Sequence, residues 1–261
     1  MSKIATKVLS SWLPTDQKSS HVNKLLSLSK ALFWLRFFHK SCHACGLFKA
    51  LSDSKKAWID GNFKSYIKRK ALGVVFVIAP WNYPYLVAVN SIIPAMAAGN
   101  SVILKHSAQT PLCSEQLYQS AKKILPKDIF NYLHLNHEDS LKIVSDKRIN
   151  FVSFTGSVKA GYDVQRATQN KFIDMTLELG GKDPAYARYD CDLEKTVENL
   201  VDGSFFNSGQ SCCGIERIYV DEKIYNNFLE LFVSKTYNYK LGNPLEKETN
   251  LGPVVDRKSV V

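Results

Sequence analysis

Features that define several protein classes are scarce or missing in this sequence of 261 residues. No stretch reaches the roughly 18 apolar residues that a membrane-spanning helix needs, because Lys30 and Arg36 interrupt the nearest candidate, residues 25–38. Repeats and low-complexity tracts are also missing. The six cysteines are irregularly spaced, unlike those of a secreted disulfide framework, at positions 42, 45, 113, 191, 212 and 213. We therefore expect a globular protein with reduced thiols.

Acidic residues are scarce near the N-terminus. Residues 1–52 contain eight Lys/Arg and one acid, Asp16, so they account for most of the net charge of +10. We expect a basic, helical extension over residues 1–56. Its Ser and Lys content weakly suggests a mitochondrial transit peptide, but Arg is scarce, so we expect a cytoplasmic protein with mitochondrial location as the alternative. A membrane-surface or nucleic-acid adaptor built on this segment is a further alternative, although no nucleic-acid-binding module is recognisable.

The same segment holds a short group of possible metal ligands. His39, Cys42 and Cys45 offer soft ligands that suit zinc, but no second Cys/His pair follows at a suitable spacing. We favour a packed amphipathic helix with incidental cysteines and predict no metal site.

From Leu72 onward, apolar strand-like runs alternate with helical patterns. This alternation predicts an α/β fold with a Rossmann-like parallel sheet covered by helices. We expect a dinucleotide-binding domain over residues 57–177 and an incomplete α/β catalytic domain over residues 178–261. Expected strands lie at 73–79, 101–105, 129–135, 149–154, 173–179 and 216–220; expected helices lie at 84–97, 111–125, 140–144, 158–168, 193–206 and 223–239.

Parallel sheets bind ligands beyond the carboxyl ends of their strands, so the loops there are the places to look for a site. Asn82 lies between two prolines after the first strand, which favours a well-fixed amide donor for a developing oxyanion. Residues 154–161 form a strand, a glycine turn and a helix start, an arrangement that can bind phosphate. They are not a nucleoside triphosphate loop, because Tyr162 and Asp163 stand where Lys and Ser/Thr are required.

Two other segments carry groups for catalysis. Cys212 and Cys213 lie in a turn of small residues, where a thiolate nucleophile could face a cleft. Taken alone, a structural cysteine pair is the simpler interpretation. Glu178 ends a strand before two glycines and could activate a water, although a surface or ion-paired Glu is the alternative for an isolated motif.

Taken together, these segments resemble the aldehyde dehydrogenase superfamily over about residues 65–256. At least five motifs occur in the family's order, which makes coincidence improbable. They are Pro80-Trp-Asn-Tyr-Pro84, Lys105-His-Ser-Ala-Gln-Thr-Pro111, Phe154-Thr-Gly-Ser157 with Gly161, Glu178-Leu-Gly-Gly-Lys182, and Gly209-Gln-Ser-Cys212 with Arg217.

The resemblance implies a catalytic role for three residues. Cys212 matches the nucleophile that forms a thiohemiacetal and then a thioester, Asn82 an oxyanion donor, and Glu178 the residue that activates the hydrolytic water. The implied function is NAD- or NADP-dependent oxidation of an aldehyde to a carboxylic acid, of the non-acylating type. The implied cofactor-binding residues are Trp81, Lys105, Ser107, Ala108, Gly156, Ser157, Gly161, Leu179 and Gly180.

The sequence departs from the family pattern at several points. Ala108 stands where many NAD-preferring members carry a Glu, so NADP is a candidate cofactor. His106 replaces the usual Pro, which we interpret as a loop variant and not as a base. Residues 1–55 match no family motif, and we expect a truncated member without the oligomerisation strand of the homo-oligomeric relatives. A non-catalytic remnant that at most binds dinucleotide is therefore the main alternative function, and it predicts uncovered apolar surface around residues 193–239.

Overall fold

The computed structural model describes residues 57–61, 63–66 and 70–255. The chain divides into two compact units, residues 1–69 and residues 70–261. The described part of the first unit is a hairpin of two antiparallel strands, β1 (Ala57–Asp60) and β2 (Phe63–Tyr66). The sequence patterns did not predict these strands. The expected N-terminal helices and the group His39, Cys42 and Cys45 lie outside the described residues.

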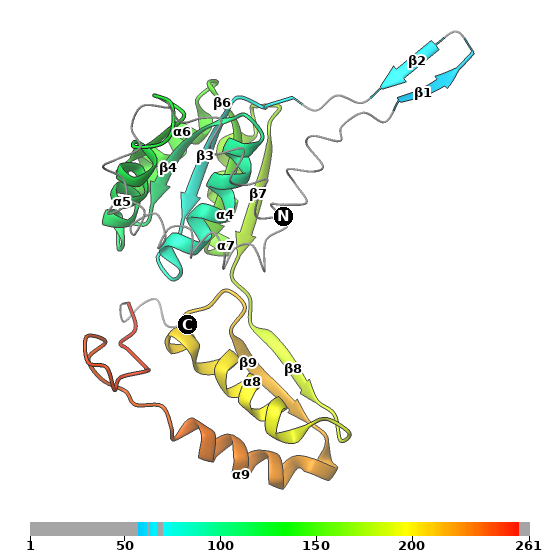
Figure 1. Ribbon diagram of the computed structural model, residues 1–261, viewed down its shortest axis with the longest axis vertical. Helices are drawn as coiled ribbons and strands as arrows, with labels where there is room; N and C mark the ends of the chain where they lie inside the picture. Colours follow the sequence, from blue (N-terminus) through cyan, green and yellow to red (C-terminus); the bar gives the residue numbers. More distant parts are fainter. Residues whose placement is uncertain (1–56, 62, 67–69, 256–261) are drawn as a thin grey trace, which may run out of the picture. The chain divides into compact units, whose positions relative to one another are not determined.

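A five-stranded parallel sheet forms the first part of the second unit, as the sequence predicted (Figure 1). Its strands, in the order β5-β4-β3-β6-β7, pair in parallel throughout. Their bounds are β3 (Val74–Ala79), β4 (Ser101–His106), β5 (Phe130–Leu133), β6 (Ile149–Gly156) and β7 (Asp174–Leu179). The helices between them are α4 (Pro84–Ala97), α5 (Pro111–Ala121), α6 (His137–Ser145) and α7 (Val158–Thr168).

Local sequence signals explain where these helices start and stop. Pro84 begins α4 and Pro111 begins α5, in the first turn, where a missing N–H costs nothing. Gly99 follows α4 with φ +87°, a conformation that glycine adopts without strain. Asn136 caps α6 by accepting a hydrogen bond from the Asp139 N–H at 2.8 Å. This cap starts α6 three residues earlier than its apolar pattern indicated.

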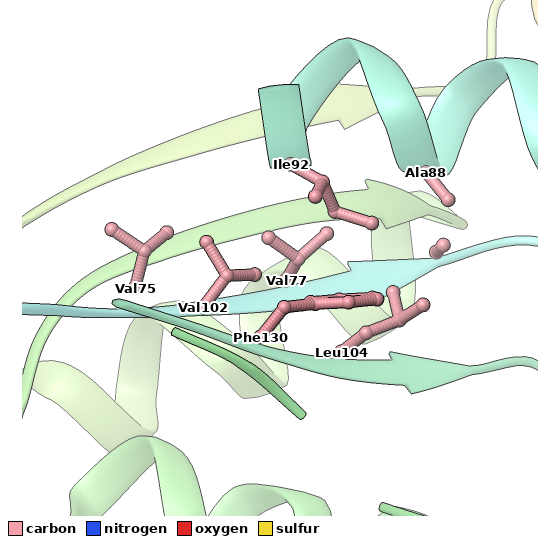
Figure 2. Close-up of a cluster of buried hydrophobic side chains, with 8 residues drawn as sticks. Val75, Val77, Ala88, Ile92, Val102, Leu104 and Phe130 are labelled. Carbon is pink, nitrogen blue, oxygen red and sulfur yellow. The ribbon is translucent and has the colours of Figure 1, made fainter. Parts of the chain in front are cut away.

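Two helices cover each face of this sheet. Figure 2 shows one face, where Val75 and Val77 of β3 and Leu104 of β4 point towards Ala88 and Ile92 of α4. Partly buried side chains of α5 complete this cluster. On the other face, alternate residues of β3 and β6 (Phe76, Val152 and Phe154) pack against Val144 of α6 and Val164 of α7. Because side chains alternate along a strand, each position of the sheet is assigned to one of these two faces.

The remaining elements form a smaller αβ arrangement. Strands β8 (Asp183–Ala187) and β9 (Ile215–Val220) pair in parallel, and helices α8 (Leu193–Phe205) and α9 (Tyr225–Thr236) pack on them around a core that includes Val197 and Phe228. Short 3-10 turns, η1 (Phe206–Gly209) and η2 (Glu222–Ile224), precede β9 and α9. The sequence did not predict β8, since Pro184 breaks its apolar pattern. No described helix is long and apolar enough to cross a membrane.

Candidate active site

The strand order places a topological switch point between β3 and β6. From β3 the chain moves to β4 and β5 on one side, then returns through α6 to β6 and β7 on the other. Ligand crevices in parallel sheets lie at such a point, beyond the carboxyl ends of the strands. The loop of residues 80–83 follows β3 here, and the turn at Gly156 and Ser157 follows β6. Two of the segments singled out from the sequence therefore flank this position.

Asn82 is tied to the loop that carries the cysteines. Its side-chain Nδ2 donates to the carbonyl oxygen of Gln210 at 3.2 Å, two residues before Cys212. In return, the Asn207 side chain donates to the Asn82 carbonyl oxygen at 3.0 Å. The rings of Tyr83 and Phe206 stack beside these contacts, with centroids 6.3 Å apart. Residues more than a hundred positions apart in sequence thus form one hydrogen-bonded unit.

Cys212 is exposed, and its backbone contacts the end of the Glu178 segment. The carbonyl oxygen of Cys212 accepts a hydrogen bond from the Gly181 N–H at 3.1 Å. Although the residue is exposed, partial desolvation of its thiol raises the pKa of Cys212 above its ordinary value, and the Cys213 thiol beside it adds to this effect. The backbone N–H groups of both cysteines act in the opposite direction by favouring the thiolate. The resting thiol is therefore protonated at neutral pH.

Glu178 lies on the same face of the sheet as α4. Thr176 lies two residues before Glu178 in β7 and donates a hydrogen bond to the Ser153 hydroxyl at 3.3 Å. Ser153 in turn hydrogen-bonds with Ser91 of α4 at 2.9 Å. By strand alternation the exposed Glu178 projects from this face. Asn82 lies two residues before Pro84, the first residue of α4, so the loop that carries this amide leads into the helix on the same face of the sheet as the carboxylate.

The predicted cofactor residues lie mainly on the opposite face. Leu179 packs in the cluster on the side of α6 and α7. Ile103 packs in the same cluster, and because side chains alternate along a strand, Lys105, two residues later in β4, faces the same side. Gly161 is buried against Leu179: a Cβ built at this glycine would lie 2.8 Å from a Leu179 methyl carbon. Ser157 caps α7 by accepting from the Ala160 N–H at 3.3 Å. The helix N-terminus therefore packs tightly at the end of β7.

Lys105 is a buried cation. It is 5% exposed, and burial alone lowers the pKa of its ammonium group. Among the described residues, no carboxylate or carbonyl oxygen accepts a hydrogen bond from this group. An isolated buried charge is costly, so the position suits a residue that gains its partner from a ligand.

The other predicted contacts are placed as follows. Ser107 starts a turn in which its backbone oxygen accepts from the Thr110 N–H at 3.1 Å, and the next residue, Ala108, is exposed. Trp81 is half-buried beside Asn82, while Gly180 is exposed with open space around it. No described contact joins these four residues into one cluster.

His106 has a larger structural role than the sequence indicated. It is the last residue of β4 rather than part of a loop, and it is 3% exposed. Burial lowers the pKa of its ring, so the ring is neutral. Nε2 donates to the Pro84 carbonyl oxygen at 2.9 Å, and the Thr110 hydroxyl lies 3.0 Å from Nδ1. His106 thus connects the starts of α4 and α5, and both ring nitrogens are engaged.

Asn207 and Gln210 are the members of this unit that the sequence analysis did not single out. Their position just before Cys212 was the only feature of the sequence that could have indicated a role. The direction of their side chains depends on a backbone conformation that the residue types do not reveal. Asn207 and Ser208 both have positive φ, 53° and 59°.

Comparison with known proteins identifies the group to which this architecture belongs. The model of the aldehyde dehydrogenase family matches residues 19–261. The chain belongs to the aldehyde dehydrogenase family. The match begins at residue 19, so the likeness extends further towards the N-terminus than the sequence motifs indicated.

Two curated relatives illustrate the degree of similarity. Peroxisomal aminoaldehyde dehydrogenase 1 of Pisum sativum is 38% identical over 215 residues, which cover 80% of this chain and 43% of the relative. Aldehyde dehydrogenase 1A1 of Homo sapiens is 36% identical over 203 residues, covering 77% of this chain and 40% of the relative. The chain therefore spans about two fifths of the length of these aldehyde dehydrogenases.

Solved aldehyde dehydrogenase structures have the same fold. The 3,6-anhydro-L-galactose dehydrogenase in complex with NAP superposes with a TM-score of 0.77 at 31% identity, covering 83% of this chain and 46% of the other. Betaine aldehyde dehydrogenase of Staphylococcus aureus in complex with NAD+ gives a TM-score of 0.73 at 32% identity, covering 81% and 43%. The α/β fold with a five-stranded parallel sheet is thus the family's fold.

Proposed function

We propose that this chain binds NAD or NADP and oxidises an aldehyde to a carboxylic acid, with Cys212 as the nucleophile. The observation that supports this most directly is the hydrogen bonding around the cysteine loop. Asn82 reaches this loop through Gln210, and Gly181, three residues after Glu178, reaches it through Cys212. The amide, the carboxylate segment and the thiol of the proposed reaction thus belong to one connected group.

The residues at the sheet edge suit a dinucleotide. Lys105 is a buried cation without an acceptor in the described structure, and a ribose hydroxyl would supply one. The turn at Gly156 and Ser157 presents the N-terminus of α7, where backbone N–H groups and the helix dipole favour a pyrophosphate. Gly161 permits the tight packing of this helix start on Leu179. When bound, the nicotinamide would supply the hydride acceptor.

The first chemical task of the protein is to activate the thiol and to stabilise an alkoxide. Because the pKa of Cys212 is raised in the resting state, a base must take its proton as the thiol adds to the aldehyde carbonyl, and Glu178 is the candidate. The carbonyl oxygen becomes negatively charged in this step. One N–H of the Asn82 amide is bonded to Gln210, which leaves the second for this oxygen, and one such donor contributes about 3 kcal/mol in acyl transfer.

The second task is to release the product. Loss of hydride from the Cys212 adduct leaves a thioester, whose carbonyl carbon is then attacked by water. Glu178, exposed on the α4 face, would first lose to solvent the proton that it took from the thiol and would then remove a proton from this water. Collapse of the resulting tetrahedral species returns the Cys212 thiol and releases the acid.

The experiment that tests this proposal measures reduced nicotinamide formed by the purified chain with a panel of aldehydes and either NAD or NADP. Wild-type chain should give aldehyde-dependent reduction, and Cys212→Ser should abolish it, whereas Cys213→Ser should retain it. Aldehyde should also protect Cys212 from alkylation. Equal loss with both serine variants would contradict the assignment of Cys212.

We further propose that NADP is accepted at this site. Ala108 is exposed in the turn after β4 and carries no charge to repel a 2′-phosphate. Ala108→Glu should therefore weaken NADP binding much more than NAD binding, measured by fluorescence titration with both cofactors. Equal weakening of NAD and NADP binding would show that the 2′-phosphate of NADP binds away from Ala108.

One observation favours a second candidate, a dinucleotide-binding protein without turnover. Large apolar side chains are exposed along α9 and after it, including Leu229, Val233, Tyr237 and Leu245. Where several large apolar side chains are exposed close together in the chain, they commonly pack against other protein. Saturable dinucleotide binding with no hydride transfer for any aldehyde, in a chain that is folded by circular dichroism, would support this candidate.

A further inference from the structure

The loop before Cys212 has an unusual backbone. Asn207, Ser208 and Gly209 are consecutive residues in the left-handed region, with φ of 53°, 59° and 74°. Glycine adopts this conformation freely, but Asn and especially Ser do so only at a cost. Such a conformation persists when the surrounding structure holds it in place. The contacts of this loop therefore indicate what the conformation is for.

The Asn207 side chain provides the central contacts. Its Nδ2 donates to the Asn82 carbonyl oxygen at 3.0 Å and to the Gln210 carbonyl oxygen at 3.3 Å. The Gln210 carbonyl oxygen also accepts from the Asn82 side chain at 3.2 Å. The Gln210 side chain completes the group by donating to the Asn207 carbonyl oxygen at 2.9 Å. Both the backbone and the side chain of Asn82 are thus held by this loop.

We propose that Asn207 is a positioning residue that directs the free N–H of the Asn82 amide and fixes the loop carrying Cys212 relative to it. This inference rests on the proposed function, in which Asn82 stabilises the oxyanion. The Asn207 amide donates both to the Asn82 carbonyl oxygen and to the Gln210 carbonyl oxygen, and the latter also accepts from the Asn82 side chain. Without it, the Asn82 carbonyl oxygen loses this donor, and the amide and the thiol are no longer held at a fixed distance.

The neighbouring residue, Ser208, has the same backbone conformation but different partners. Its hydroxyl donates to the Gly252 carbonyl oxygen at 2.6 Å. Gln210 is braced from the same side, since its Oε1 accepts from the Val255 N–H at 2.7 Å. Among the described residues, Ser208 makes no hydrogen bond with Asn82. It therefore offers a matched control for the loss of a side chain at a left-handed position.

The experiment compares Asn207→Gly with Ser208→Gly in the whole chain. Both substitutions keep positive φ accessible, but only the first removes the amide that reaches Asn82. We expect Asn207→Gly to lower kcat for aldehyde oxidation by about 10- to 100-fold, the size of effect that misplacing a catalytic group produces, with the KM for dinucleotide unchanged. Ser208→Gly should stay within about twofold. Asn207→Asp, which keeps the shape and removes the donor, should behave like Asn207→Gly.

A double-mutant cycle separates positioning from general loosening. If Asn207 acts through Asn82, Asn207→Gly should cause little further loss of kcat in an Asn82→Ala background, because residues that share one function are not additive. Additive losses would overturn the proposal, as would equal losses in Asn207→Gly and Ser208→Gly.

A readout without turnover keeps this test separate from the proposed function. Alkylation of Cys212 by iodoacetamide is followed by peptide mass spectrometry at a temperature where all variants are folded by circular dichroism. Because partial burial raises the pKa of this thiol, loosening the loop in Asn207→Gly should increase its alkylation rate and shift the pH profile to lower pH. Ser208→Gly should match wild type. If wild type shows no hydride transfer, the proposed function fails, and equal alkylation of the two glycine variants would then still refute the role of Asn207.

Discussion

Replacing Lys105 by methionine tests whether this lysine is kept for a ligand at the expense of stability. The Lys105 side chain is 5% exposed, its pKa is lowered by burial alone, and no described residue accepts a hydrogen bond from its ammonium group. Methionine has a similar length and no charge. The substitution should therefore remove the cost of burying the ammonium group while the packing around its methylene chain is retained.

The expected magnitudes follow from this environment. Replacing buried charged groups by well-packed apolar side chains is neutral or stabilises by about 1–4 kcal/mol. For a lysine that lacks a partner we expect Lys105→Met to raise the free energy of unfolding by about 1–3 kcal/mol. A charge-assisted hydrogen bond to a ligand contributes about 1.5–3 kcal/mol, so dinucleotide affinity should fall by about 10- to 100-fold. Stability and binding should thus change in opposite directions.

The pH dependence of the free energy of unfolding gives a second check of the direction of the Lys105→Met effect. The pKa of Lys105 is lower in the folded chain than in the unfolded chain, so the unfolded state binds the extra proton. The cost of the charge is fully present below the folded pKa and disappears as the pH rises from that value towards the ordinary lysine pKa. The stability advantage of Lys105→Met should therefore be largest at low and neutral pH and should shrink in alkaline solution.

The assay is urea unfolding at several pH values together with fluorescence titration of NAD and NADP. Lys142→Met is the control, because Lys142 is exposed on α6 and paired with Glu138 and Asp139. It should destabilise slightly, if at all, and leave dinucleotide binding unchanged. A lower free energy of unfolding for Lys105→Met would show that the ammonium group has a stabilising partner and would refute the reasoning.

Four further predictions concern the chemistry and the sheet edge. Asn82→Ala should lower kcat by about 100-fold, measured by steady-state formation of reduced nicotinamide, because it removes one oxyanion donor. Glu178→Gln should block steady turnover and hydrolysis of a Cys212 thioester formed from an activated ester, which mass spectrometry would detect; rapid turnover would contradict its role. Gly161→Ala should destabilise the fold by about 1–3 kcal/mol in urea unfolding, since its Cβ would lie 2.8 Å from a Leu179 methyl carbon. Alkylation of Cys212 should rise with pH through a midpoint above the ordinary cysteine value of about 8.5, because its pKa is raised; a midpoint near neutrality would contradict the burial effect.

Much of the sheet could be predicted from the sequence because each buried strand is a nearly continuous apolar run. The run from Gly73 to Ala79 predicted β3, and the structure places it at Val74–Ala79 in the centre of the sheet. Strand β8 was missed for the opposite reason. It is short, contains Pro184, and pairs with a single described strand, so its sequence has no buried apolar run, and only Ala185 and Ala187 alternate with the exposed Tyr186. Pairing, rather than residue type, defines this strand.

The candidate site was predictable at its motifs but not in its connections. Asn82, Glu178 and Cys212 were named because each lies at a strand end or a small-residue turn. The hydrogen bonds that join their segments run through Asn207 and Gln210, whose amides could equally face solvent. His106 was interpreted as a loop variant, whereas its burial at the end of β4 follows from contacts with Pro84 and Thr110. These long-range contacts depend on three-dimensional packing that a motif does not contain.

In the proposed function, the two faces of the sheet would separate dinucleotide binding from the reaction of the aldehyde. Lys105, the Gly156 turn and Leu179 belong to the side of α6 and α7, whereas Asn82 and Glu178 belong to the side of α4. An aldehyde carbon that must meet both the bound dinucleotide and the catalytic residues would therefore lie beyond the ends of the strands, between the two faces. The thiol at this position comes from a segment outside the sheet, so helix packing cannot hold it there. We infer that the hydrogen bonds from Asn82, Asn207 and Gly181 hold this segment instead, and they accompany the left-handed backbone of residues 207–209 in the loop before Cys212.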